Sequence, residues 1–152
     1  MTQSNALLSS PAPPRFALLL ALSGTLPVLA GLAGLMLELQ QVTGPVIRSL
    51  AIYGAVIVSF IGGAHWGLAC ARLSGAPLNR HLIYSVIPAL LGWAVAAQPL
   101  TIAFMGLALL FPAVLVLDLA ARRDAIVPDW WMTMRLPPTI VMMAAYALLV
   151  FY

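Results

Sequence analysis

The chain has 152 residues, of which 63% are hydrophobic and only 7% are charged, and its mean hydropathy is +1.05. Soluble domains carry about 25% charged residues, so this composition excludes an ordinary water-soluble domain and indicates a polytopic helical membrane protein. The seven basic residues are all arginines scattered between apolar segments, so the net charge of +3 does not predict nucleic-acid binding.

The N-terminal residues are polar and rich in proline and serine, and we predict that residues 1–15 form a disordered cytoplasmic tail. The apolar segment Phe16–Leu37 follows, interrupted by Pro27. A cleavable signal peptide is the alternative interpretation, because Leu29–Gly31 resembles a small-residue cleavage site. The apolar run exceeds the usual signal-peptide core of about 7–15 residues, so the sequence favours an uncleaved first membrane helix.

Four further apolar segments follow the first one. The segment between Arg48 and Arg72 reaches roughly 35 Å as a helix, enough to cross a hydrocarbon core of about 30 Å. The short connection at Gln98–Pro99 predicts that the third and fourth helices are antiparallel neighbours. Proline is tolerated in a first turn, so the last helix is expected to begin at Pro137. We therefore predict one all-α domain over residues 16–152, a bundle of five transmembrane helices at about 16–37, 46–72, 80–97, 100–120 and 137–152.

The distribution of arginines predicts the orientation in the membrane. Six arginines fall on one side of the predicted bundle and only Arg48 on the other. The positive-inside rule therefore predicts a cytoplasmic N-terminus and an external C-terminus. Trp130 and Trp131, close to Arg135, are typical of an aromatic belt at the cytoplasmic interface.

His65 is an ionisable residue about 10 Å below the arginine-rich end of the second helix. Such a residue is costly in a membrane unless it faces protein or water, which makes it a candidate site. The simplest interpretation is a neutral packing histidine that hydrogen-bonds a neighbouring helix. The alternatives are an axial haem ligand, with His81 as the second histidine, or a quinone site formed by His65, Trp66 and Trp93.

Ser59, Gly63 and Gly67 form a small-residue stripe on the second helix, a pattern that lets another helix approach closely. Interior-type residues also line the face that carries His65. We therefore predict that the second helix is the central helix of the bundle and that the stripe is a helix-packing surface.

Asp118 and Arg122 are spaced four residues apart at the end of the fourth helix, in the order that favours an ion pair. Arg135, at the start of the last helix, is a competing partner for Asp118. Glu38 and Arg48 flank the first external loop and are most simply two solvated charges. No nucleophile–base pair, phosphate-binding loop or zinc-ligand spacing is present, so we predict no catalytic residue and no metal site.

Several segments together resemble the domain-of-unknown-function family numbered 3429, a family of small multi-pass membrane proteins. They are YGAVIVSFIGGAHWGLA, IPALLGWAV, Asp118, the Trp130-Trp131 pair, Arg135-Leu136 and Thr139, and the likeness covers nearly all of the chain after residue 15. The resemblance implies a five-helix protein of the bacterial inner membrane or its mitochondrial descendants, with no established activity to transfer. By position, His65, Trp66, Gly67, Trp93, Asp118 and Arg135 match the pattern.

Two functional hypotheses follow from the sequence. The first is an accessory or assembly component of a larger membrane complex, in contact with lipid and with other membrane-protein subunits or a second copy, and without a cofactor. The second is a redox protein that binds haem or quinone through His65.

Overall fold

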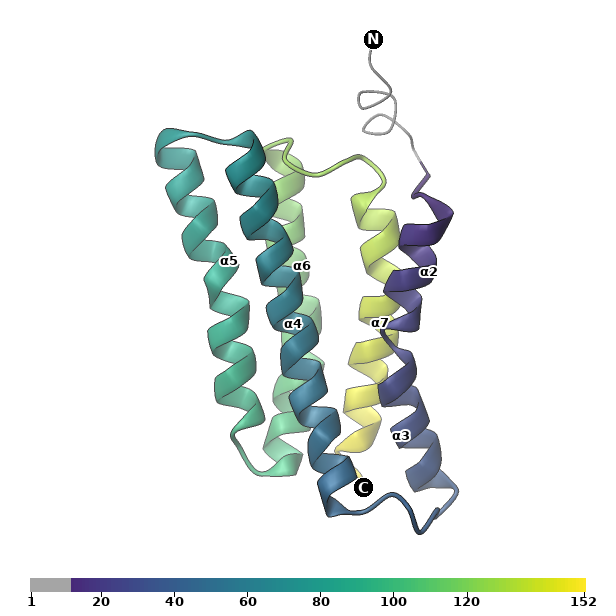
Figure 1. Cartoon of the computed structure of the whole chain (residues 1–152). Coiled ribbons are helices and arrows are strands. Elements are labelled where there is room, and N and C mark those ends of the chain that lie inside the picture. Colours follow the sequence, from purple (N-terminus) through teal and green to yellow (C-terminus); the bar gives the residue numbers. More distant parts are fainter. Residues whose placement is uncertain (1–11) are drawn as a thin grey trace.

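The computed structural model describes residues 12–152, and every regular element in that range is an α-helix. The predicted tail, residues 1–15, lies outside the described residues as far as residue 11. The helices run up and down side by side, so that the described chain enters at one end of the bundle and finishes at the other (Figure 1). They are α2 (Arg15–Ser23), α3 (Leu26–Met36), α4 (Gly44–Arg72), α5 (Gly75–Ala96), α6 (Leu100–Arg123) and α7 (Trp131–Leu149).

Four of the five crossing segments are long and apolar enough to span a membrane: Arg15–Met36 taken together, α4, α6 and α7. The fifth, α5, carries the polar residues Asn79, Arg80 and His81 in its second turn and runs antiparallel beside α4 over a similar length (Figure 1). The chain is therefore a multi-pass membrane protein with an all-α fold.

The first crossing segment is broken at Gly24–Thr25 rather than continuous. Pro27 lacks an N–H group and its ring would clash with the carbonyl four residues earlier, which interrupts the helix. The break is stabilised by α4, because the Tyr53 hydroxyl donates a hydrogen bond to the Gly24 carbonyl over 2.8 Å. The interruption is thus a fixed bend held against the second crossing segment.

The last helix begins at Trp131, six residues before the predicted start at Pro137. Pro137 and Pro138 lie inside α7, where their missing N–H groups free two carbonyls of the first turns. The earlier start places Trp131 and Arg135 on the helix itself, one turn apart.

The core lies between α4, α6 and α7 and centres on Tyr146, which is fully buried. The Tyr146 ring stacks on Phe111 with ring centroids 5.6 Å apart and an interplanar angle of 13°. Its hydroxyl donates a 2.7 Å hydrogen bond to the Leu50 carbonyl. Gly54 leaves the space for this contact, because a Cβ there would meet the tyrosine hydroxyl. A large aromatic side chain thus joins α7 to α4 through both stacking and a hydrogen bond.

Close contact between α4 and α5 depends on Gly62 and Gly92. A Cβ on Gly62 would collide with the backbone carbonyl of Ser85, and one on Gly92 would lie 3.2 Å from the Ala55 carbonyl. The predicted stripe behaves differently: nothing lies within 4 Å of a Cβ placed on Gly63 or Gly67. Consecutive helical residues point about 100° apart, so the face of Gly62 meets α5 while Gly63 faces outward.

We predict that Gly62→Ala destabilises the protein by about 1–3 kcal/mol, the usual cost of overpacking, because the new methyl group meets backbone that cannot rotate away. Gly63→Ala is the matched control and is expected to leave stability unchanged or to raise it by up to about 1 kcal/mol, the usual gain from replacing a helical glycine by alanine. Unfolding of both variants in detergent, followed by helical circular dichroism, provides the comparison. Equal stability of the two variants would show that α4 and α5 do not pack as described.

Candidate functional site

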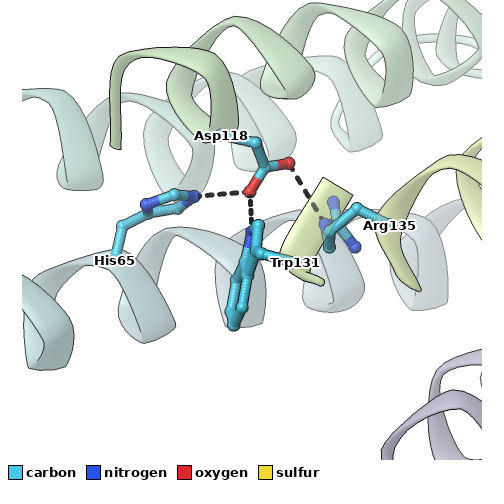
Figure 2. Close-up of polar contacts among 4 residues, drawn as sticks. All are labelled: His65, Asp118, Trp131 and Arg135. Carbon is cyan, nitrogen blue, oxygen red and sulfur yellow. Dashed lines mark hydrogen bonds and ion pairs between the residues drawn. The ribbon is translucent and has the colours of Figure 1, made fainter. Parts of the chain in front are cut away.

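A buried carboxylate, Asp118, gathers three donors from two other helices (Figure 2). Asp118 lies on α6 and is 0% exposed. Its Oδ1 accepts hydrogen bonds from Nε2 of His65 on α4 over 3.0 Å and from Nε1 of Trp131 on α7 over 2.5 Å. Its Oδ2 accepts a hydrogen bond from Nε of Arg135, also on α7, over 3.1 Å. We call these four residues the Asp118 cluster.

Local helix geometry explains why these side chains converge. Trp131 and Arg135 are four residues apart on α7 and therefore share one face. His65 belongs to the face of α4 that carries Gly54, Val58 and Gly62, all of them buried. An ionised carboxylate only accepts hydrogen bonds, so each of the three neighbours donates a hydrogen bond to it. The cluster thus ties α4, α6 and α7 together near the arginine-rich end of the bundle.

The cluster combines a buried ion pair, Asp118 with Arg135, and two further hydrogen-bond donors, His65 and Trp131. His65 is 5% exposed and Arg135 is 9% exposed, so water hydrates neither the imidazole of His65 nor the guanidinium of Arg135 well. Buried pairs are sensitive to the loss of one partner, because the remaining charge then has no compensation. The arrangement can therefore fix helix positions strongly.

The predicted ion pair between Asp118 and Arg122 is absent; Arg135 takes its place. The Asp118 side chain faces the bundle interior, whereas Arg122 is exposed in the last turn of α6. A long arginine side chain near a helix end reaches the aqueous boundary, where its charge is hydrated. The competing partner named from the sequence is the one that forms. Glu38 and Arg48 form no ion pair in the described chain, and Arg48 instead donates to the Gln98 carbonyl over 2.7 Å.

The residues predicted to bind a cofactor do not come together. His65 is engaged by Asp118, whereas Trp66 and Trp93 are 46% and 73% exposed on the outer surface of the bundle. His81 hydrogen-bonds a different carboxylate, Asp124, over 2.7 Å. The two histidines therefore each have an acidic partner of their own. In the described residues, 12–152, no group of three metal-ligating side chains gathers at one point.

A second polar group at the same end of the bundle was not predicted. Oδ2 of Asp124, just beyond α6, accepts hydrogen bonds from His81 Nε2 and from Arg80 Nη2, each over 2.7 Å. The hydrogen bond from His81, with the Arg80 charge beside it, holds the pKa of the Asp124 carboxyl below its ordinary value. This contact fastens the start of α5 to the end of α6. A signal was present, since Arg80 and Asp124 both flank connections expected on one side of the membrane.

The contacts that His65 and Trp131 make to Asp118 were also missed. His65 lies seven residues before Arg72, and Asp118 lies five residues before Arg123. Both are therefore ionisable groups at a similar depth below the same end, which is a usable signal for a pair. Trp131 gave no such signal, because an interfacial tryptophan and a hydrogen-bonded one look alike in a sequence.

The chain is similar to a protein family and to a vertebrate membrane protein. A family model described as protein of unknown function (DUF3429) matches residues 13–151. Transmembrane protein 69 of Xenopus tropicalis is 33% identical over 138 residues, which cover 84% of this chain and 51% of that protein. The chain thus spans about half the length of this curated relative. No solved structure matches.

We predict that Asp118→Asn lowers the free energy of unfolding by about 3–5 kcal/mol, because it leaves the Arg135 charge buried without a counter-ion. The matched control is Asp129→Asn, since Asp129 is exposed in the connection between α6 and α7. Unfolding in mixed detergent gives both values. The double variant Asp118→Asn/Arg135→Gln is expected to lose less than the sum of the two single variants. Additive losses would contradict the ion pair.

Proposed function

The chain belongs to the DUF3429 family. We propose that it acts as a non-catalytic accessory component of a membrane complex. In this proposal a membrane helix of the partner packs on α4. The observation that carries this proposal is the open backbone at Gly63 and Gly67. Both glycines are exposed, four residues apart, on a face of α4 that meets no other helix of the described chain. Close approach of two helices in a membrane depends on such small residues, because packing rather than hydrophobicity drives the association.

The Asp118 cluster supports a structural role in the same proposal. A fully buried carboxylate with three donors is not poised to act as a base or nucleophile, which requires reach to a substrate. It does hold α4 at fixed height and rotation against α6 and α7. A helix held in this way presents its outer face without further ordering cost, and preordered surfaces bind more tightly than mobile ones.

Haem or quinone binding through His65 is the weaker alternative. It would require His65 Nε2 to leave Asp118, where it donates a 3.0 Å hydrogen bond. Trp66 and Trp93, the aromatic residues expected to line that site, point to the outside of the bundle. We therefore keep the partner-binding function as the proposal, in the inner membrane of a bacterium.

Cys70 offers a direct test, because it is exposed and lies one turn beyond Gly67 on the same face of α4. We predict that a photoactivatable maleimide on Cys70 crosslinks the chain to another membrane protein in native membranes. Gly63→Leu, which places a bulky side chain in the open backbone, is expected to reduce the adduct several-fold. Val116→Leu, at an exposed position of α6, is the matched control.

The mass of the adduct decides the identity of the partner. An adduct with the mass of two chains would show that the partner is a second copy of this chain and not a different subunit. Labelling of lipid alone, or an adduct that Gly63→Leu leaves unchanged, would refute packing on this face.

We further propose that the arginine-rich end faces the cytoplasm. The structure gathers at that end the start of α2, the connection from α4 to α5 and the connection from α6 to α7 (Figure 1). We predict that alkaline phosphatase fused after Tyr152 is active and that the same enzyme fused before residue 1 is inactive, because it folds only outside the cytoplasm. The reverse pattern would invert the topology.

A further inference from the structure

A cavity of about 340 Å³ lies between α2, α4 and α7. Its wall is mostly apolar and includes Leu20 of α2, Phe60 and Ala64 of α4, and Met142 of α7. Small-molecule sites are typically apolar cavities of about 300–1,000 Å³ with a few polar groups. The size and lining are therefore those of a site for an apolar molecule.

Two residues of the wall each carry a buried polar atom without a hydrogen-bond partner among residues 12–152. The Nη2 atom of Arg135 and the Oγ1 atom of Thr139 are buried and make no hydrogen bond to any described residue. Both residues line the cavity, and they share one face of α7 because they are four residues apart. Arg135 is 9% and Thr139 3% exposed. A buried donor without an acceptor is costly, and bulk water is scarce at this depth.

The geometry also gives a route from the bilayer. At this level α2 packs against α7, whereas α3, beyond the break at Gly24–Thr25, packs against both α4 and α7. The cavity follows α2 and reaches that break. Phe16 and Leu19 on the outer side of α2 are 72% and 64% exposed, as expected of a lipid-facing helix. A lipid-soluble molecule therefore approaches from the membrane rather than from water.

We propose that this cavity binds a long-chain apolar molecule whose head carries uncharged carbonyl oxygens. Arg135 Nη2 and Thr139 Oγ1 donate hydrogen bonds to those oxygens, and the apolar chain lies along α2. Charge balance selects a neutral head. Arg135 already compensates Asp118, so an anionic head would add a buried charge without a counter-ion. Membrane quinones and acylglycerols share this chemistry. The inference does not depend on a partner at α4.

The test uses the full chain in nanodiscs and a monoacylglycerol that carries a photoreactive diazirine. We expect saturable labelling of peptides from α2 and α7. A decyl-chain benzoquinone and unlabelled monoacylglycerol are added as competitors. Comparing how strongly each one reduces the labelling shows whether the cavity prefers a quinone or an acylglycerol. A stronger effect of either one supports the proposal and names the source. Oleate is the anionic competitor and is expected to be the weakest of the three.

Thr139→Val is the decisive variant, because it removes a donor that makes no hydrogen bond within the described part of the chain. It is expected to leave thermal stability unchanged or slightly raised. It is also expected to lower the affinity for the probe about two- to tenfold, the usual effect of losing one hydrogen bond. Thr133→Val is the matched control: the same substitution on α7 at an exposed position outside the cavity. It should bind the probe like the unmodified chain.

Three results would overturn the proposal. Labelling that does not saturate would mean that only water or bulk lipid enters the cavity. Equal affinities of Thr139→Val and Thr133→Val would remove Thr139 from the site. Tighter binding of oleate than of both neutral competitors would show that the head group is anionic.

Discussion

The fold depends on one carboxylate placed where water cannot reach it. Asp118 is fully buried within a membrane-spanning helix, so its charge must be balanced by neighbouring helices if the bundle is to form. Arg135 supplies the opposite charge, and His65 and Trp131 supply hydrogen bonds. Each donor has to stand at one height and one rotation to reach the carboxylate. A single charge therefore specifies the relative placement of α4, α6 and α7, which apolar packing alone would define less sharply.

Packing farther from the arginine-rich end depends on an uncharged side chain, Tyr146. Tyr146 stacks on Phe111 and reaches the Leu50 carbonyl with its hydroxyl, while Gly54 supplies the space. Between the two anchor points, Gly62 and Gly92 bring α4 and α5 into backbone contact. The first crossing segment is held differently, by the bond from Tyr53 to the carbonyl at the break. The cavity opens beside α2, where these contacts give way to a bent segment that packs mainly on α7.

Composition and periodicity were enough to predict an all-α membrane protein and the approximate positions of its helices. Boundaries were harder. Pro137 was expected to open the last helix, but α7 begins at Trp131 and carries both prolines inside. Proline marks the first turn of a helix only when nothing upstream stabilises that helix, and here Asp118 binds both Trp131 and Arg135. The tertiary contact overrides the local rule, and the sequence alone does not display that contact.

The candidate site was predictable in its parts but not in its pairing. His65, Asp118 and Arg135 stood out because ionisable residues are rare in membrane helices. The partner nearest in sequence, Arg122, was chosen by spacing, while the true partner comes from another helix. Small residues caused a similar ambiguity. Gly62 and Gly63 are neighbours in the chain, yet one meets Ser85 and the other faces outward. The rotation of α4 about its own axis decides which of the two glycines packs against α5, and contacts between helices set that rotation.

The two unpartnered donors explain why position 135 suits arginine better than lysine. A guanidinium carries donors that point in several fixed directions, whereas an ammonium is a compact charge on a flexible stem. Nε of Arg135 donates to Asp118, whereas Nη2 has no hydrogen-bond partner among residues 12–152. A lysine could satisfy the carboxylate, but its flexible ammonium would not hold a second donor in a fixed direction. The same side chain thus closes the ion pair that builds the bundle and supplies the polar point of the cavity beside it.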